Sequence, residues 1–518
     1  MKIVSVEQMK AIERAADASG VSYEMMMKNA GRGIANWISR NVSHRQGVIG
    51  LVGAGNNGGD TLIALTWMAK WGLRTQAFLV KENGNDALLD DYLSSGGAVV
   101  DISRNDRLDF FDAALIPGVV VLDGILGTGF RLPLRRPLHD VMVNIHKRLE
   151  NRSDLLIIAV DCPSGVDCDT GEVSAATIPA AYTLTMAAMK QGLLSHPARS
   201  FAGDLHYIDI GIGDPSIYTK DGLSEMIDHS VIRDLFPRRP DSGHKGTFGT
   251  CLMIAGSAPY VGAAYFSGKA AYRMGCGLVH MGVVRDVHRL LAGRLLEAVW
   301  SVIPDIEGVF DPDGLQVLLS ALQSATAIAI GPGWGVNESN ILFLTDLLQH
   351  LPPSTPLLID ADALKLLVNL KQWWSLLPDQ VVLTPHPGEM SVLTRLKTSE
   401  IQSNRWEIAS EYAKLWRVNL VLKGALTVIA CANGKIFINP VSDPALATAG
   451  SGDVLTGVIG GLMAQGVSAA HASVLGVWIH ANSGKIARIN CKTDMSVTAL
   501  DLLDYLPGAI VKAKEAGY

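Results

Sequence analysis

The sequence has few charged residues and no long basic run. Charged residues make up 18% of the 518 positions, and Lys plus Arg (44) are outnumbered by Asp plus Glu (50), for a formal net charge of −6. This balance argues against a protein that binds nucleic acid through a basic surface. Hydrophobic residues make up 48%, which excludes a chain that is disordered throughout.

Cysteines are also few. The six are scattered without a CxxC pair, which argues against a zinc site and a disulfide framework. The first residues carry charges throughout and lack the apolar core of a signal peptide. One stretch, Val454–Gly484, has no charged residue and is long enough to span a bilayer, but it contains His471, His480, Gln465 and Asn482. We expect a pair of buried helices there, no membrane contact and a cytoplasmic protein.

Short runs of β-branched and apolar residues alternate with helical stretches along the whole chain. Runs that are apolar on both faces are typical of central strands in a parallel sheet covered by helices, so we predict an α/β fold. Several runs end in Gly, Asp or Pro, and ligands of such sheets bind at the carboxyl ends of the strands. The runs are Gly47–Gly53, Thr75–Val80, Val119–Asp123, Leu155–Asp161, Thr250–Ala255, Ala327–Gly331, Pro356–Asp360, Val381–Thr384, Asn419–Lys423 and Leu426–Cys431.

A domain boundary is indicated between Gly211 and Gly246. The segment 211–222 is rich in turn residues, and 236–246 is basic with Pro and Gly. We predict two α/β domains, residues 1–215 and residues 225–518.

The Gly-rich segment Gly53–Asp60 follows one predicted strand and precedes a predicted helix over Thr61–Trp71. It contains GxGxxG, which by itself is a weak indication of a nicotinamide-dinucleotide site. Its continuation as Asn-Asn-Gly-Gly-Asp is unusual for that fingerprint. Backbone N–H groups there could bind phosphate, and the amide and carboxylate oxygens could bind a hard cation. A purely structural Gly-rich turn remains an alternative.

Two further strand ends carry an Asp. Asp123 precedes Gly-Ile-Leu-Gly-Thr-Gly-Phe, and Asp161 precedes Cys-Pro-Ser-Gly. A single Asp after a strand is often only a helix cap. With Asp60, however, three such loops favour a pocket lined with oxygen atoms.

These three motifs, in this order and spacing, resemble the YjeF N-terminal family of NAD(P)H-hydrate epimerases, which includes the apolipoprotein A-I binding protein. The resemblance covers residues 1–215 and implies a Rossmann-like three-layer domain. It implies proton transfer by Asp60, Asp123 or Asp161, without choosing among them. One departure is Thr61, where the family usually has Gly. It also implies a potassium ion at Asn57, Asp123 and Ser164, and substrate contacts at Asn56, Asn57, Gly58, Gly59, Asp60, Gly127, Thr128, Gly129, Phe130, Arg131, Leu132, Pro133 and Asp161.

In the second half, Ala449–Asp453 precedes the uncharged stretch. Small residues at a helix start leave backbone N–H groups free to form an anion hole, and Asp453 could deprotonate a hydroxyl that attacks a phosphoryl group. Lys423 and Thr427 lie in a predicted turn between two strands, where they could reach nucleotide phosphates. A plain helix cap is the alternative for Gly-Ser-Gly-Asp alone. No GxxxxGK[ST] occurs, which excludes a P-loop enzyme.

Further loops follow predicted strands in this half. They contain HKG, GSx4GAA, GxGLV, GPGxG, DADAL, TPHPGE, KGxxT and GSGD, in that order over residues 244–453. This set resembles the NAD(P)H-hydrate dehydratases of the ribokinase-like superfamily. One departure is Ala449, where the family commonly has Gly. The resemblance implies substrate contacts at Ala263, Gly335, His386 and Asp453, and nucleotide contacts at Lys423, Gly424, Ala425, Leu426, Thr427 and Gly452.

Both halves in one chain resemble the bifunctional bacterial NAD(P)H-hydrate repair enzymes. The implied function is epimerisation of R- and S-NAD(P)HX, followed by dehydration of the S form at the expense of ADP or ATP, with Asp453 as base and magnesium on the phosphates. The choice between ADP and ATP, the preference between NADHX and NADPHX, the magnesium ligands and a possible homo-oligomer stay open.

Two other functions compete with this interpretation. A ribokinase-like small-molecule kinase fused to a non-catalytic YjeF N-terminal binding scaffold would leave a stable phosphorylated product. A dehydrogenase built on GxGxxG would transfer hydride, but it does not account for the GSGD and KGxxT loops.

Overall fold

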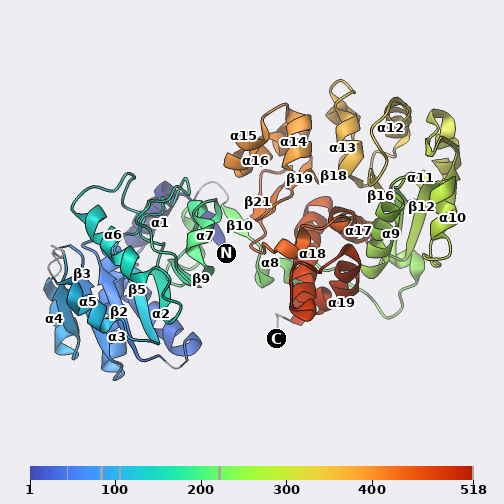
Figure 1. Ribbon diagram of the computed structural model, residues 1–518. Helices are drawn as coiled ribbons and strands as arrows, with labels where there is room; N and C mark the ends of the chain where they lie inside the picture. The colour runs from blue at the N-terminus through green and yellow to red at the C-terminus, as the bar shows by residue number, and fades with distance from the viewer. Residues whose placement is uncertain (44, 82–85, 104–106, 220–222, 516–518) are drawn as a thin grey trace. The chain divides into compact units, whose positions relative to one another are not determined.

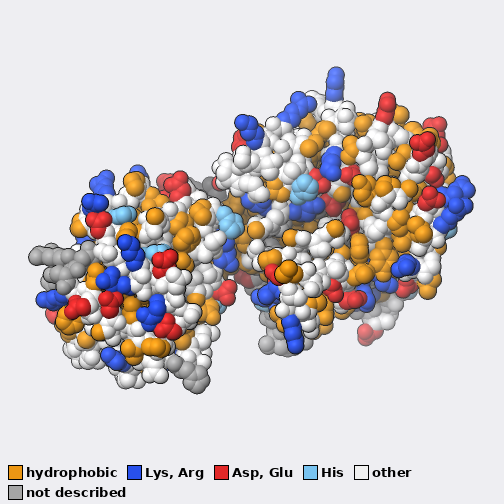
Figure 2. All heavy atoms as spheres, in the orientation of Figure 1, with side chains coloured by type: hydrophobic (Ala, Val, Ile, Leu, Met, Phe, Trp, Pro, Cys, Tyr) orange, Lys and Arg blue, Asp and Glu red, His pale blue; other side chains and the backbone are white. Residues whose placement is uncertain are grey.

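The computed structural model describes residues 1–43, 45–81, 86–103, 107–219 and 223–515. The chain forms two structural units, Met1–Ser224 and Glu225–Tyr518 (Figure 1). On the visible face, basic and acidic side chains are interspersed rather than separated into fields of one sign (Figure 2).

The first unit is built on a seven-stranded sheet in the order β4-β3-β2-β5-β6-β7-β9, and all its neighbouring strands are parallel. The strands are β2 (Gly47–Val52), β3 (Thr75–Leu79), β4 (Ala98–Asp101), β5 (Val119–Gly124), β6 (Leu156–Val160), β7 (Tyr182–Met186) and β9 (Asp204–Ile208). Strands β1 (Lys2–Val4) and β8 (Met189–Lys190) lie outside this seven-stranded sheet and pair parallel with each other.

Helices cover both faces of this sheet (Figure 1). One apolar core contains Ile34 of α2 and Leu65 of α3, and the other contains Phe111 of α5 and Ile145 of α6. Strand β2 is buried along its whole length and contributes alternate side chains to the two cores. The helices are α1 (Val6–Ala18), α2 (Tyr23–Asn41), α3 (Asn56–Lys70), α4 (Asp86–Ser94), α5 (Leu108–Ala114), α6 (Leu138–Leu149) and α7 (Arg199–Ala202).

The second unit has a sheet in the order β13-β12-β11-β16-β17-β18-β19-β20-β21. Its neighbours are parallel as far as β19, and β19-β20-β21 form antiparallel hairpins. These strands are β11 (Thr250–Ile254), β12 (Leu278–Val284), β13 (Val299–Ile303), β16 (Ala327–Ile330), β17 (Leu357–Ile359), β18 (Val381–Leu383), β19 (Asn419–Leu422), β20 (Val428–Ala430) and β21 (Ile436–Ile438). In addition, β10 (Ser224–Met226) pairs parallel with β21, and β14 (Asp305–Ile306) pairs antiparallel with β15 (Val309–Phe310).

The helices of this unit share one large apolar core with its sheet. They are α8 (His229–Arg233), α9 (Val261–Arg273), α10 (Arg285–Leu291), α11 (Leu319–Ser324), α12 (Glu338–His350), α13 (Ala361–Leu367), α14 (Pro387–Thr394), α15 (Thr398–Ser403), α16 (Arg405–Trp416), α17 (Ser451–Ala464), α18 (Ala469–Cys491) and α19 (Ala499–Glu515).

The predicted strands are confirmed, because each of the ten apolar runs contains one strand of the structure. One detail was wrong: β20 is antiparallel to β19, since a tight turn joins them and leaves no room for a crossover. The uncharged stretch forms the expected pair of buried helices, α17 and α18. Among the described residues, no helix meets the length and apolarity needed to cross a membrane.

Candidate active sites

The site of the first unit lies where the strand order of its sheet reverses. Strands β2 and β5 are neighbours, and the chain moves away from them in opposite directions. Ligands of open α/β sheets bind in the crevice at such a point. A cavity of about 800 Å³ is found there. It brings together the predicted residues Asn56, Asn57, Asp60, Gly127, Thr128, Gly129, Phe130 and Asp161.

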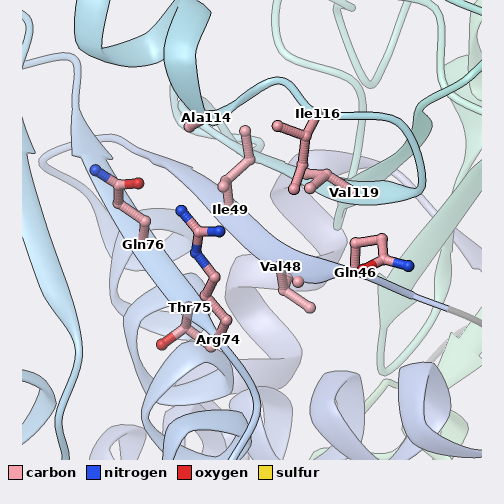
Figure 3. Close-up of a pocket in the computed structure, with 10 residues that line it drawn as sticks. Gln46, Val48, Ile49, Arg74, Thr75, Gln76, Ala114, Ile116 and Val119 are labelled. Carbon is pink, nitrogen blue, oxygen red and sulfur yellow. The ribbon is translucent and has the colours of Figure 1, made fainter.

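Two predicted contacts face elsewhere. Leu132 and Pro133 line a neighbouring cavity of about 620 Å³, together with Arg136, His139 and Glu172. At the opposite, amino ends of β2 and β3 lies a small pocket with Arg74 and Gln76 at its wall (Figure 3). Its volume of about 10 Å³ is at most enough for one water molecule, which excludes it as a substrate site.

The Asn-Asn-Gly-Gly-Asp segment forms the first turn of α3, so the predicted helix start at Thr61 was wrong. Gly55 is the extended N-cap and makes no side-chain capping bond. The helix can begin this early because residue 58 is a glycine, which lets the backbone pass close to Gly53. A Cβ at this position would lie 1.9 Å from the Gly53 oxygen. The first-turn N–H groups have no partner within the helix and can bind an anion.

The close contact of Gly58 gives a testable expectation. We expect Gly58→Ala to lower the free energy of unfolding of the first unit by about 1–3 kcal/mol, because the backbone must shift to admit the methyl group. Gly55→Ala is the matched control, since its Cβ would meet no atom within 4 Å. Urea unfolding measures both changes. Equal stabilities of the two variants would contradict the packing argument.

Asp123 and Ser164 form a buried oxygen-rich cluster beside Asn57. The Asp123 carboxylate accepts from the Ser164 N–H at 2.8 Å and from the Ser164 hydroxyl at 2.5 Å. Burial raises the pKa of Asp123, and the bonds from Ser164 oppose this shift. The Asn57 amide donates to the Leu126 carbonyl at 2.9 Å, while its buried Oδ1 has no partner among the described residues. An unpartnered oxygen beside a carboxylate fits a hard monovalent cation.

Asp60 and Asp161 occupy the cavity with a lysine that the sequence motifs did not reveal. Lys190 is 1% exposed and forms an ion pair with Asp161. Its ammonium also donates to the Met186 carbonyl at 2.9 Å. Burial raises the pKa of Asp60 well above its ordinary value, and the charges of Asp161 and Glu13 add to the shift. The sequence signal that could have revealed Lys190 is a single charged residue at the end of the otherwise uncharged run 182–190.

In the second unit, Asp453 lies in the first turn of α17. Gly450 caps this helix in a left-handed conformation (φ +86°) without a side-chain bond. The Ser451 N–H donates to the Thr448 carbonyl at 3.3 Å, whereas the N–H groups of Gly452 and Asp453 have no partner within the helix and can bind an anion. Burial raises the pKa of Asp453 to about 7, with a further contribution from the charge of Asp360. Behind the turn, His480 lies with Nε2 3.0 Å from the Ser451 carbonyl, and burial lowers its pKa to about 4.

The predicted nucleotide residue Lys423 belongs to a buried charge network. Its ammonium donates to Asp360 at 2.8 Å and lies 3.8 Å from Glu389. Burial lowers the pKa of Lys423, but the two carboxylates outweigh this effect and the net shift is upward. Thr456 of α17 donates to the other Asp360 oxygen at 2.5 Å. Sequence reasoning missed the roles of Thr456 and Glu389. A Cβ added to Gly452 would lie 3.6 Å from the Lys423 ammonium, so these two predicted nucleotide residues are close together.

His386 acts as the N-cap of α14. Its Nδ1 accepts from the N–H groups of Gly388 at 3.0 Å and Glu389 at 3.2 Å, and its Nε2 lies 3.4 Å from a Glu389 carboxylate oxygen on a half-exposed ring. The Gly335 N–H donates to Asp362 at 2.9 Å. Ala263 starts α9 and faces the same Gly-rich loop, since a Cβ on Gly333 would lie 2.8 Å from its side chain.

The turn Lys423–Thr427 joins β19 to β20, as predicted. Gly424 (φ +142°) and Leu426 (φ +58°) both adopt left-handed backbone conformations, and Thr427 donates to the Gly424 carbonyl at 3.2 Å. No group of three or more His, Cys, Asp or Glu side chains within the described ranges is arranged to hold a metal ion.

Two family models match the chain. Residues 23–192 match a model described as the YjeF-related protein N-terminus. Residues 251–508 match a carbohydrate-kinase-type model described as NAD(P)H-hydrate dehydratase. The predicted fold class, a YjeF N-terminal α/β unit followed by a ribokinase-like α/β unit, is therefore confirmed.

Individual proteins resemble the chain over nearly its full length. The bifunctional NAD(P)H-hydrate repair enzyme of Moorella thermoacetica is 35% identical over 99% of this chain and 98% of its own. That of Thermofilum pendens is 33% identical over 99% and 97%. A solved protein of Streptococcus mutans, described as hypothetical, is 25% identical with a TM-score of 0.50, and the match covers 56% of this chain and 99% of that one. The chain thus belongs to the family of bifunctional NAD(P)H-hydrate repair enzymes.

Proposed function

We propose that the first unit interconverts the R and S epimers of hydrated NADH or NADPH, and that the second unit dehydrates the S epimer. The observation that carries this proposal is the pairing of two different strand-end sites in a chain of this family. One site has acidic side chains around a cavity, as proton transfer needs. The other has a carboxylate at an anion-binding helix start, as phosphoryl transfer needs.

Dehydration must break the C6–O bond of the hydrated nicotinamide ring, and hydroxide is a poor leaving group. We propose that Asp453 takes the proton of the C6 hydroxyl. The hydroxyl oxygen then accepts the terminal phosphoryl group of ADP or ATP. Phosphate then leaves with the C–O electron pair, the ring nitrogen supplies electrons, and a proton is lost from C5. The products are NAD(P)H, phosphate, and AMP or ADP.

The anion hole at Gly450–Asp453 supports the transferring phosphoryl group. Backbone N–H groups that point at developing charge are fixed before the reaction, and losing one such donor typically costs about 2.7–4 kcal/mol of transition-state stabilisation. Substrate contacts are proposed at Ala263, Gly335 and His386, and nucleotide contacts at the Lys423–Thr427 turn and Gly452.

Magnesium does not fit a protein-only site in this unit. Asp360 and Glu389 both face the Lys423 ammonium, and the described residues form no cage of three or more ligating side chains. Magnesium in nucleotide chemistry bridges the phosphates themselves, so we propose that it arrives on the nucleotide.

Potassium fits the first unit, where Asn57, Asp123 and Ser164 would hold it. The unpartnered Asn57 oxygen and the buried Asp123 carboxylate are oxygen ligands of the kind hard cations prefer. When bound, the ion would supply a fixed positive charge at the pocket floor. The side chains themselves orient the Leu126 backbone, which contacts both Asn57 and Ser164.

A substitution tests this cation site. We expect Asn57→Leu to slow epimerisation about tenfold and to abolish its dependence on potassium, because one oxygen ligand is lost. Rates with potassium and with the larger cation caesium would be compared, with dehydration of pure S epimer as the internal control. Unchanged potassium stimulation in the variant would contradict the assignment.

Recovery of absorbance at 340 nm tests the whole proposal. The protein is added to mixed R- and S-NADH hydrate with magnesium, potassium and either ADP or ATP. Full recovery supports both activities and identifies the nucleotide. Recovery of the S fraction alone would make the first unit a non-catalytic scaffold. No recovery with either nucleotide, together with phosphorylation of another small molecule, would favour a kinase.

A further inference from the structure

The ion pair between Lys190 and Asp161 is buried in the wall of the first unit's cavity. Lys190 ends β8, and its ammonium is held by Asp161, by the Met186 carbonyl and by the Thr185 hydroxyl at 3.3 Å. Asp161 also accepts from the Met186 N–H at 3.0 Å and adopts a left-handed backbone conformation (φ +64°). Both partners line the cavity. The Asp161 carboxylate is therefore fixed in position by an adjacent cation.

Among the described residues, no cation is in direct contact with Asp60. It lies in the first turn of α3, with the charges of Asp161, Glu13 and Lys190 acting on it. Burial raises its pKa well above the ordinary value, and Asp161 and Glu13 raise it further. The two carboxyl groups in this cavity thus differ in their surroundings, because Asp161 pairs with a lysine whereas burial favours the protonated form of Asp60. Such a difference is a common way of assigning acid and base roles. The other titratable groups that act on this cluster are Lys10, Cys162 and Cys168.

We propose that Lys190 is a positioning residue that keeps Asp161 as the proton acceptor of epimerisation and leaves Asp60 as the proton donor. This inference rests on the proposed epimerase function of the same site. We assign no proton transfer to Asp123. Both of its carboxylate oxygens accept hydrogen bonds from Ser164, and Asp123 is not among the residues that line the cavity.

The chemical step balances without a further reactant. Asp161 takes the proton of the C6 hydroxyl, the C6–O bond becomes a carbonyl, and the C6–N1 bond breaks with its electron pair on nitrogen, which receives a proton from Asp60. Rotation and closure on the other face reverse these transfers. Cleavage of the C6–N1 bond is favoured over loss of hydroxide for two reasons. The nitrogen is conjugated to the carboxamide, and no nucleotide takes part at this site to make hydroxide a better leaving group.

Isotopic labelling tests which bond breaks. The C6–O bond stays intact in this scheme, so the oxygen should be retained when epimerisation runs in ¹⁸O-labelled water. Incorporation of label at the rate of epimerisation would overturn the step.

Lys190→Met tests the positioning role in the full-length chain. We expect epimerisation at pH 7 to fall roughly 10²-fold, the low end of what a positioned acid–base group contributes. The acidic limb of the pH profile should move to higher pH, because the carboxylate cluster loses its cation and binds protons more tightly. Asp60→Asn should instead remove the alkaline limb. Lys70→Met, which breaks an exposed pair with Asp91 on the same unit, is the matched control and should match the wild type.

A double variant covers the case in which Lys190→Met fails to fold. Asp161→Asn/Lys190→Met removes both charges, and its epimerase rate should equal that of Asp161→Asn within about twofold. A further large loss would show that Lys190 acts on the substrate directly and would overturn the proposal, as would an unshifted pH profile in a folded Lys190→Met. Failure of the wild type to convert the R epimer, with dehydration of S intact, would instead reject the epimerase function itself.

Discussion

Asp453→Asn is expected to abolish dehydration of the S epimer while leaving epimerisation unchanged. The amide cannot take the proton of the C6 hydroxyl, and a positioned base contributes about 10²–10⁴-fold to such a step. In the wild type, burial and the charge of Asp360 raise the pKa of Asp453 to about 7. The base is active only when ionised, so the wild-type rate should rise as the pH passes through about 7.

The same substitution should stabilise the second unit above neutral pH. The folded-state pKa of Asp453 lies above the ordinary carboxyl value, so ionisation opposes folding, and stability is lost as the pH rises through about 7. A shift from 3.8 to about 7 corresponds to at most about 4 kcal/mol, at 1.36 kcal/mol per unit. We therefore expect a higher melting temperature for Asp453→Asn at pH 8, a smaller increase at pH 5 and no increase below about pH 4.

The exposed Asp379→Asn is the matched control, because its carboxylate lies in water in the same unit. It should keep full dehydratase activity and an unchanged melting temperature at both pH values. Dehydration persisting in Asp453→Asn would remove Asp453 as the base. A lower melting temperature at pH 8 would show that its charge stabilises the fold.

The strand-end motifs were predictable from the sequence because their signals are local. A β-branched run followed by Gly, Asp or Pro predicts both a buried strand and a ligand-facing loop, and Asp123, Asp161 and Asp360 all follow such runs. The helix start at Asn56 was not predictable in this way. It depends on the close approach of Gly58 to Gly53 in three dimensions.

The partners of the buried charged residues could not be predicted from the spacing of residues in the sequence. Lys190 lies 29 residues from Asp161, and Thr456 lies 96 residues from Asp360. Each pair forms because tertiary packing brings together elements that lie far apart in the sequence. These partners give each carboxylate its own contacts, and for that reason the sequence alone left the roles of Asp60, Asp123 and Asp161 undivided.

Asp360→Asn is expected to be the most destabilising single change in the second unit. Asp360 is 2% exposed on its side chain and is held by Lys423 and Thr456. Its removal leaves the Lys423 ammonium with only Glu389, 3.8 Å away. Breaking a buried pair on one side typically costs about 3–5 kcal/mol, since the remaining charge is buried without its partner. Urea unfolding of the second unit measures the loss.

Two variants separate charge from packing in this network. Asp360→Asn/Lys423→Met removes both charges and should recover much of the lost stability. Thr456→Val removes one hydrogen bond to a charged group and should cost about 1.5–3 kcal/mol. A double variant no more stable than Asp360→Asn would show that packing at this position, and not the unpaired ammonium, carries the effect.

The Asp360 substitution should also move the activity profile of the dehydratase. Asp360 is one of the charges that raise the pKa of Asp453, and Lys423 lowers it. With Asp360 neutral and Lys423 released, Asp453 should ionise at lower pH, so the residual rate should reach its plateau on the acidic side of the wild-type midpoint. The same buried carboxylate therefore stabilises the fold through Lys423 and holds the base of the reaction near neutral pH. If the pH–rate profile of Asp360→Asn kept its midpoint at about pH 7, Asp360 would stabilise the fold without setting the pKa of Asp453.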